Sequence, residues 1–580
     1  MKKFETKMAS WVVALFAVFS LFSCEGPDGP VDWNTVPDAD FNITNQVVFQ
    51  YCGDEIQSSL GQDLSETVFE QSVAIQLKAK DIEKYLNSRI VKVIVGLNGT
   101  DNQQLTTQYD DLKIWVRRGN IKSEKVWEQS FDGTITLNSW NEVVAKEFYR
   151  IDDVAEDLFI GYTVYANGLP IGTDGADASM GVVDKKGCWI YDCDSKRWIQ
   201  HADNGHISIK AVFAGDMLPK VELSGIKAPS YIKSKTSFPV ALTVKNLVDA
   251  ELASFDLVLK HEGKKLTSKT VELPWTLRKG ESMSVFVEDL SLDNEGDFLI
   301  TYSIEQINGE KSTSDGEVAL NRRTVVANNL VERTVLLENT TGDMCSNCPA
   351  GHDYIEKAMK EVGEDKFIWM AHHAGYNAGK YTSNQSDTVA RIFYNTQMTY
   401  APGLMINRTN LLSVGVTTSG EPGGPIFSVN EVASRGMLDE YFRLMQSDMS
   451  PIALDVQHNF DAATRNLSVT VKGDILVELA NRSTLALGIA ILEDNLEGTQ
   501  AGIAGKYMHS HVCRDAMTSI LGTLVKGDSN TFECTYSKAL NAKFVPENVS
   551  IVVWVANKPA TVSECDNYKI YQAYKVKLVK

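Results

Sequence analysis

The sequence has no long apolar run beyond its first two dozen residues, and it has no excess of positive charge. No later segment is apolar and long enough for a membrane span, which needs about 20 residues. The formal net charge of −19 argues against nucleic acid as a partner. With 580 residues, the length predicts about four domains. These features predict a soluble, multi-domain body in an extracytoplasmic compartment.

The N-terminus has the pattern of a secretory signal. Lys2, Lys3 and Lys7 form a basic start, and residues 11–22 form an apolar run too short to span a bilayer. The run ends at Cys24 in the letters LFSC, which resemble the lipobox of bacterial lipoproteins. In that class the cysteine is acylated and becomes the first residue of the mature chain. An ordinary signal peptide with an accidental cysteine is the alternative interpretation.

The segment after Cys24 predicts a tether rather than a folded element. Its letters EGPDGP combine glycine and proline, which do not suit a helix. Acidic residues at this place resemble the surface-export signal of Bacteroidetes lipoproteins, although a solvated acidic tether would look the same. The predicted location is therefore the cell envelope, as an outer-membrane lipoprotein that can face the cell surface.

Cysteine is sparse as well. The chain has nine cysteines, of which eight remain beside Cys24. An even number permits disulfides in an oxidising compartment, but their pairing cannot be read from the sequence. The most informative pair is Cys345 and Cys348, which are separated by two residues and followed by Pro349.

Hydrophobic periodicity predicts a mainly β, multi-domain chain with one α/β domain. Most of the chain shows short alternating strands separated by turn residues. One segment instead alternates strands and helices around the CxxC motif. The predicted parts are a signal peptide over 1–23, a tether over 24–45, a jelly roll over 46–217, an immunoglobulin-like sandwich over 218–325, a thioredoxin-like domain over 326–450 and a C-terminal β-sandwich over 451–580.

The predicted jelly roll carries several tryptophans. Together with their neighbouring letters, Trp115, Trp127 and Trp140 resemble the galactose-binding-like jelly rolls of secreted Bacteroidetes proteins, including cleaved-adhesin domains. That resemblance implies ligand binding or a spacer role. Exposed indoles would form a platform for stacking sugars, whereas buried indoles would fill the core, which is the more common use of aromatic area.

The CxxC motif is predicted to lie between a buried strand and a helix. At that position the positive end of the helix dipole favours a thiolate at the first cysteine. We therefore predict Cys345 as nucleophile and Cys348 as resolving thiol. Three alternatives stay open: half of a zinc site, an inert structural disulfide, or separate pairing of each cysteine. The zinc site lacks a second CxxC or a histidine pair at the usual spacing.

Pro402 is the third predicted site residue. Thioredoxin folds place a cis-proline before a strand that faces the CxxC, and the letters from Tyr400 to Ile406 resemble that element. A cis bond costs little before proline. An ordinary loop proline is the alternative.

Residues from about 331 to 580 resemble the outer membrane protein 28-related lipoproteins of Bacteroidetes. The resemblance rests on TVLLE from Thr334, TG at Thr341 with the CxxCP run, AHHAG from Ala371, the letters from Pro402 to Arg408, and HSHVCR from His509. It implies a thioredoxin-like domain followed by a β-sandwich at the cell envelope. Met344 stands where thioredoxins commonly have an aromatic residue.

Two functions follow as hypotheses. In the first, the thioredoxin-like domain exchanges disulfides with a protein partner, through Cys345, Cys348 and Pro402. In the second, the chain is a non-enzymatic adhesion lipoprotein that binds glycan or protein, and the CxxC is a structural disulfide. Neither hypothesis requires a cofactor or a metal, and both place the chain on a membrane through Cys24.

Overall fold

In the computed structural model, two compact units divide the chain after Leu218. The structure describes residues 36–61, 68–99, 109–176, 184–201, 203, 205–216, 218, 220–311, 320–375, 379–393, 399–416, 425–479, 482–527, 529–559 and 568–579. The predicted signal peptide and Cys24 lie outside these residues. Within them, none of the helices has the length and apolarity that a membrane crossing requires.

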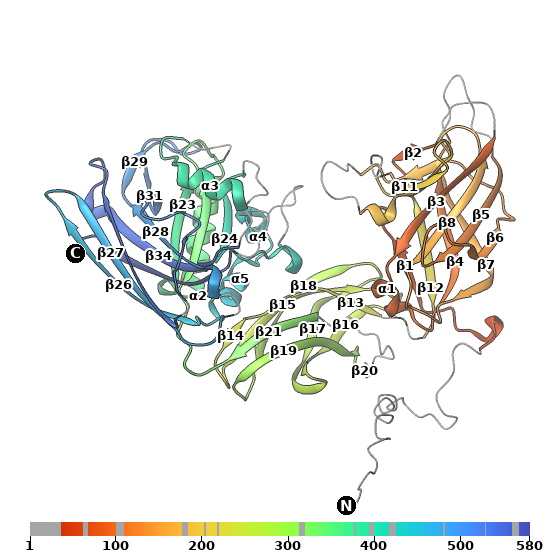
Figure 1. Ribbon diagram of the computed structural model, residues 1–580, viewed down its shortest axis with the longest axis horizontal. Coiled ribbons are helices and arrows are strands. Elements are labelled where there is room, and N and C mark those ends of the chain that lie inside the picture. The colour runs from red at the N-terminus through yellow and green to blue at the C-terminus, as the bar shows by residue number, and fades with distance from the viewer. Residues whose placement is uncertain are drawn as a thin grey trace, which may run out of the picture. The chain divides into compact units, whose positions relative to one another are not determined.

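The first unit is built from two six-stranded antiparallel sheets, with strand orders β1-β12-β4-β9-β2 (β7 pairs with β4) and β11-β10-β3-β8-β5-β6 (Figure 1). Trp115 of β5 is fully buried, whereas Trp127 and Trp140 are half-buried. The elements are β1 (Gln46–Gln50), β2 (Ser58–Leu60), β3 (Phe69–Leu77), α1 (Ala79–Ile82), β4 (Arg89–Leu97), β5 (Tyr109–Arg118), β6 (Lys125–Ser130), β7 (Ser139–Arg150), β8 (Leu158–Ala166), β9 (Ile171–Thr173), β10 (Trp189–Asp192), β11 (Arg197–Gln200) and β12 (Ile209–Ala214).

The second unit begins with two sheets that enclose one apolar core. Their strand orders are β13-β15-β18 and β14-β21-β19-β16-β17, with β20 on β19. Alternate residues such as Leu242, Val244, Leu257 and Leu259 fill the space between them. The strands are β13 (Val221–Lys227), β14 (Tyr231–Ile232), β15 (Phe238–Asn246), β16 (Leu252–His261), β17 (Lys264–Leu277), β18 (Ser282–Leu290), β19 (Gly296–Ile307), β20 (Glu310–Lys311) and β21 (Leu320–Val326).

The rest of the second unit is organised by one nine-stranded mixed sheet. Its order is β25-β24-β22-β23-β31-β28-β34-β35, with β32 on β28. The elements before residue 450 are β22 (Val335–Thr341), α2 (Cys348–Val362), β23 (Phe367–His373), α3 (Asn384–Phe393), β24 (Gly403–Ile406), β25 (Phe427–Ser428), α4 (Val429–Ser434) and α5 (Leu438–Gln446). The later ones are β26 (Ile452–Asp461), β27 (Asn466–Ile475), β28 (Leu485–Glu493), β29 (Leu496–Gly498), β30 (Tyr507–His509), β31 (Val512–Ala516), β32 (Thr523–Leu524), β33 (Thr531–Ala539), β34 (Val549–Asn557) and β35 (Ile570–Lys577).

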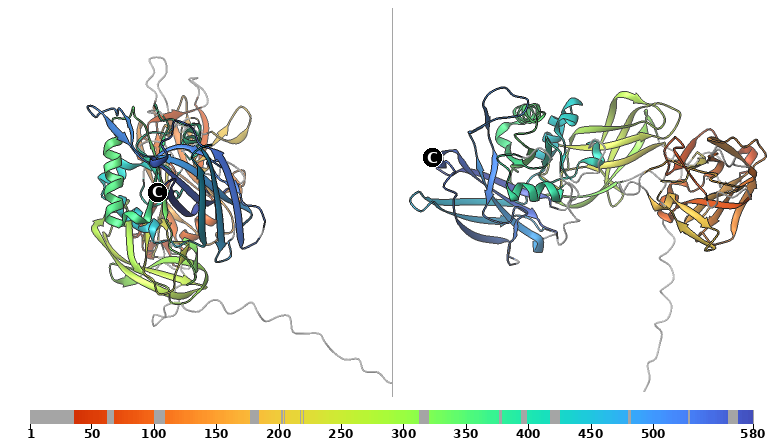
Figure 2. Two further views of the ribbon diagram at one scale, coloured as in Figure 1. Left: turned by 90° about the vertical axis from the view of Figure 1, so that its left-hand side faces the viewer. Right: turned by 90° about the horizontal axis from the view of Figure 1, so that it is seen from above.

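This sheet runs across the predicted boundary between residues 450 and 451. The join is the parallel bridge between Ala371 of β23 and Val512 of β31. Strands from the two predicted segments therefore share one sheet, instead of forming two bodies that only pack together. Helices α2, α4 and α5 cover one end of the sheet, and β26-β27-β33 cover β28 and β34 (Figures 1 and 2).

The helical segment differs from expectation at one place. The letters SVNE from Ser428 form a capping box, and the apolar residues up to Met445 recur at helical spacing. This pattern predicts one helix, but the structure has α4 and α5 instead. Gly436 lies between them with φ of 71°, which ends α4 and redirects the chain. Leu438, Tyr441, Phe442 and Met445 still bury one apolar face.

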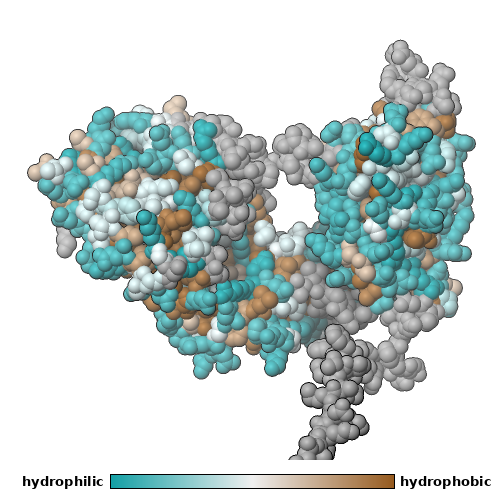
Figure 3. Space-filling model, in the orientation of Figure 1, coloured by the Kyte–Doolittle hydropathy of each residue, from teal (hydrophilic) through white to brown (hydrophobic). Residues whose placement is uncertain are grey.

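The exterior fits the acidic composition. Most of the surface visible in Figure 3 is hydrophilic. Some large apolar side chains are exposed, among them Trp275 of β17 and Met344 beside the CxxC, at 64% and 65%.

Candidate functional site

Cys345 and Cys348 form a disulfide at the start of α2, with Cα atoms 5.5 Å apart. Strand β22 ends at Thr341, and a tight turn follows in which the Cys345 N–H donates to the Gly342 carbonyl at 3.1 Å. Cys348 is the first residue of α2, and Pro349 lies in the first helical turn, where N–H groups need no helical partner. The strand–turn–helix placement expected for the pair is therefore present.

Pro402 lies directly against this helix. The peptide bond between Ala401 and Pro402 is cis, and the Ala401 carbonyl oxygen is 3.5 Å from the Cys345 sulfur. A Cβ on Gly351 would lie 2.6 Å from Pro402 Cβ, so the absent side chain of Gly351 permits the close approach. The structure thus brings the three predicted site residues of this segment together.

The two sulfur-bearing residues are covered. Cys345 is 2% exposed and Cys348 is 0% exposed. The loop between β29 and β30, which the sequence analysis did not assign to the site, lies on the turn that holds Cys345. The Gln500 amide donates to the carbonyls of Cys345 and Gly342 at 2.7 and 3.1 Å. The segment had no sequence signal beyond its glycines, so only the fold places it here.

Glu338, on the strand before the CxxC, is fully buried in an ion pair. Its carboxylate accepts two hydrogen bonds from Arg408, at 2.7 and 2.8 Å, and His372 lies 3.4 Å away. Burial by itself would raise the pKa of Glu338, but Arg408 outweighs it and lowers the pKa to about 2. The carboxylate therefore stays ionised at neutral pH.

A pocket of about 400 Å³ opens beside α2, at the side where β30 lies. Its lining includes four histidines, which come from α2, β23, β30 and the turn before β31: His352, His373, His509 and His511. The rings pack with neighbouring aromatics, as in the stack of Trp369 on His511 at 5.1 Å. Among the described residues, no group of three or more histidine, cysteine or acidic side chains is arranged to hold a metal ion.

Burial controls the protonation of His352, His373 and His509. It lowers the pKa of His352 to about 4 and that of His373 to about 3, and the neighbouring histidines add to both shifts. The pKa of His509 is lowered by burial too. These three imidazoles are therefore neutral at pH 7 and serve as packing and hydrogen-bonding groups.

The fold and the site define the class of protein: it is a mainly β, multi-sheet protein in which a short helical segment carries a buried CxxC. The model of the family described as outer membrane protein Omp28 matches residues 417–572. This match supports the predicted assignment to the outer membrane protein 28-related family, and with it an outer-membrane or cell-surface location. The matched range contains the run from His509 to Arg514, whereas the CxxC precedes it.

Solved structures resemble the chain only remotely. HBP35 of Porphyromonas gingivalis is 16% identical with a TM-score of 0.34, and the match covers 43% of this chain and 76% of that one. The CARDB domain of a Pyrococcus furiosus protein is 17% identical with a TM-score of 0.15, over 19% of this chain and 89% of that one. A Bacteroides uniformis beta-glucuronidase is 11% identical with a TM-score of 0.17, over 62% of this chain and 41% of that one. No curated protein sequence matches the chain.

Proposed function

We propose that residues 326–450 form a thioredoxin-like domain that exchanges disulfides with a protein partner at the cell envelope. The observation that carries the proposal is the Cys345–Cys348 disulfide at the positive end of α2, with the Ala401–Pro402 segment against it. The element order β22, α2, β23, α3, β24, β25 and the pairing of β22 with both β23 and β24 support it. In this proposal Pro402 positions the partner's chain.

The reaction would proceed in two exchanges. In the dithiol state, the Cys345 thiolate attacks one sulfur of the partner's disulfide, and the partner's other sulfur leaves as a thiolate. The Cys348 thiolate then attacks the Cys345 sulfur, which closes the Cys345–Cys348 bond and releases the second partner thiolate. Two electrons pass from the dithiol to the partner, and the two thiol protons go to the released thiolates. The reverse sequence, with a partner dithiol as reductant, reopens the bond.

A redox titration tests this proposal. The chain from Glu25 onward is equilibrated in glutathione or dithiothreitol buffers, and alkylation of the two cysteines is followed by mass spectrometry. A reversible couple between about −120 and −270 mV, lost in Cys345→Ser, is the result expected for a working dithiol. A disulfide that stays closed below about −300 mV would overturn the proposal.

The burial of both cysteines favours a second candidate function. In that alternative, the disulfide is a structural staple, and the chain is an adhesion protein that binds glycan or protein. The fully buried Trp115 cannot serve as a sugar platform, so Trp127 and Trp140, which are half-buried, would have to. Glycan-array binding that is lost in Trp127→Ala or Trp140→Ala would support this alternative.

We also propose that Cys24 carries the lipid that holds the chain on the membrane, after removal of residues 1–23. The support is the sequence pattern together with the outer-membrane family match. Metabolic labelling with a palmitate analogue should mark the wild-type chain and leave Cys24→Ala unmarked. Labelling that persists in Cys24→Ala would contradict the anchor.

A further inference from the structure

The β-hairpin formed by β29 and β30 lies beside the turn that holds Cys345. Strands β29 and β30 pair only with each other in the described structure, as a two-stranded sheet separate from the nine-stranded one. A two-stranded hairpin alone is marginally stable in water. The loop 499–506 at its tip, here called the cover loop, therefore keeps its place through contacts with the rest of the site.

The contacts of the cover loop concentrate on the turn that holds Cys345. Gln500, itself 2% exposed, donates its amide hydrogens to the carbonyls of Gly342 and Cys345. The Ala501 N–H donates to the Asp343 carbonyl at 2.8 Å. A Cβ on Gly502 would lie 3.0 Å from the Ser346 carbonyl oxygen, so the loop backbone lies directly on the turn.

The base of the hairpin has contacts of its own, among them the packing of the His509 ring against Tyr381 and His373. The Tyr381 hydroxyl donates to the Glu497 carbonyl at 3.0 Å. The Tyr507 hydroxyl lies 3.3 Å from His352 Nδ1. Gln500 thus makes two of the three hydrogen bonds that join the cover loop to the CxxC turn in the described structure.

We propose that the hairpin is a displaceable cover and that Gln500 is the positioning residue that latches it over Cys345. The cover loop donates N–H groups to three acceptors of this turn, the carbonyls of Gly342, Asp343 and Cys345. An extended polypeptide offers donors of the same kind along its backbone. The partner class is therefore a protein segment that replaces the cover loop, and this inference rests on the proposed exchange reaction.

The rate at which dithiothreitol opens the disulfide measures the cover without any protein partner. The full chain from Glu25 onward, as wild type and as Gln500→Ala, is treated with reductant, trapped with maleimide and analysed by mass spectrometry. Loss of two hydrogen bonds should raise the reduction rate about tenfold, because the covered state becomes less populated. Gln500→Glu, which places a carboxylate against the carbonyls of Gly342 and Cys345, should be at least as fast. Gln457→Ala, an exposed glutamine of β26, is the matched control and should equal wild type.

Hydrogen exchange separates opening of the cover from general destabilisation. In Gln500→Ala, amides of β29 and β30 should exchange faster while those of β28 and β34 keep the wild-type rate. Equal reduction rates in wild type and Gln500→Ala, or faster exchange throughout β28 and β34, would overturn the latch.

A second assay tests the latch and the exchange reaction independently of each other. Wild type and Gln500→Ala are each reduced with dithiothreitol to the Cys345/Cys348 dithiol, freed of the reductant and incubated with an unfolded, disulfide-bonded ribonuclease. Faster reduction by dithiothreitol with no exchange in either form would support the cover and contradict the exchange reaction. Exchange by wild type at the same rate as Gln500→Ala would support the reaction and contradict the latch.

Discussion

At the scale of single residues, the buried ion pair of Glu338 with Arg408 is the clearest test of the structure. Both side chains are fully buried, so neither charge has solvent as a substitute partner. Arg408→Met should lower the free energy of unfolding by about 3–5 kcal/mol, because Glu338 would keep an uncompensated charge. Chemical denaturation of the full chain measures it.

Two variants complete the test of this pair. Arg391→Met, on an exposed position of α3, should change the free energy by no more than about 0.5 kcal/mol. The double variant Glu338→Gln with Arg408→Met should recover much of the loss. A cost for Arg408→Met below about 1 kcal/mol would contradict the burial of this charge pair.

The same residues show where residue-scale prediction ends. The sequence marks Glu338 as a carboxylate on the strand before the CxxC, and that placement is right. Its partner stands 70 residues later, and the pattern around Arg408 contains nothing that links it to Glu338. Cys345 and Cys348 could be predicted as a pair because only two residues separate them in the sequence. Gln500 also contacts Cys345, but more than 150 residues separate the two along the chain, so no local pattern links them.

At the scale of elements, the packing of α2 on the Pro402 segment depends on one missing side chain. Alanine at position 351 would gain about 1 kcal/mol of helix propensity over glycine. Its Cβ, however, would overlap Pro402 Cβ at 2.6 Å, and the ring is attached to backbone that cannot move aside freely. We expect the steric overlap with Pro402 to outweigh the gain in helix propensity, so Gly351→Ala should lower the unfolding free energy by about 1–3 kcal/mol.

Denaturation again provides the measurement for Gly351→Ala. Glu361→Ala, on the exposed side of the same helix, is the control and should stay within about 0.5 kcal/mol of wild type. A Gly351→Ala chain that is more stable than wild type would show that α2 and Pro402 are not in close contact.

Elements whose signals are local were predicted, and those that depend on distant pairing were not. The helix after the CxxC, the strand after Pro402 and the apolar face of α5 follow from periodicity and turn residues. The parallel bridge from β23 to β31 joins residues 371 and 512, and a single pair of that kind leaves no pattern in either strand. Hairpin β29–β30 was missed because each strand has only three residues.

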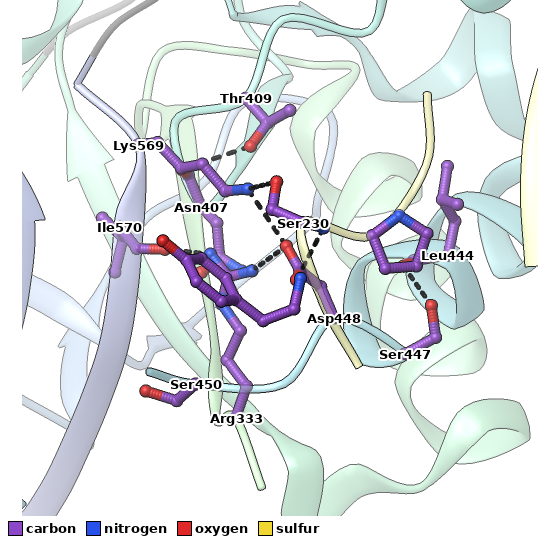
Figure 4. A network of polar contacts seen from close by, with 12 residues as sticks. Ser230, Arg333, Asn407, Thr409, Leu444, Ser447, Asp448, Ser450, Lys569 and Ile570 are labelled. Atoms are coloured by element: carbon purple, nitrogen blue, oxygen red, sulfur yellow. Dashed lines mark hydrogen bonds and ion pairs between the residues drawn. The ribbon is translucent and has the colours of Figure 1, made fainter. Parts of the chain in front are cut away.

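At the scale of the whole second unit, Asp448 connects three of the predicted segments. Its carboxylate accepts from the backbone N–H groups of Ser230 and Tyr231, and it pairs with Arg333 and Lys569 at 2.7 and 3.1 Å (Figure 4). Burial alone would raise the pKa of Asp448, but Lys569 and Arg333 outweigh it and hold the pKa below its usual range. Residues of the sandwich, of the helical segment and of the start of the last strand thus all contact the Asp448 carboxylate.

Removal of that charge should weaken all three segments together. In Asp448→Asn, the buried Arg333 and the partly exposed Lys569 lose their counter-ion, so the unfolding free energy should fall by about 3–5 kcal/mol. Asp439→Asn breaks a solvent-exposed pair with Arg443 and should cost only about 0–1 kcal/mol. Denaturation curves followed by tryptophan fluorescence measure both, and similar losses in the two variants would contradict the role given to Asp448.

The buried histidines make the stability of the second unit depend on pH. Their pKa values in the folded chain, about 4 for His352 and about 3 for His373, lie below the value of about 6.5 expected in the unfolded chain. The unfolded chain therefore binds protons first, so this stability is fully present above pH 6.5 and is lost as the pH falls toward 4. At pH 5 the loss should be about 2 kcal/mol for each histidine.

Urea unfolding at pH 7.5, 6 and 5 measures this dependence. The carboxylates discussed above contribute little in that window, because the pKa of Glu338 is about 2 and that of Asp448 is held below its usual range. His352→Gln should reduce the slope of unfolding free energy against pH, since one proton fewer is taken up on unfolding. A wild-type unfolding free energy that is constant from pH 7.5 to 5 would mean that His352 and His373 are accessible to protons in the folded chain, and that the pocket beside α2 is more open than the structure has it.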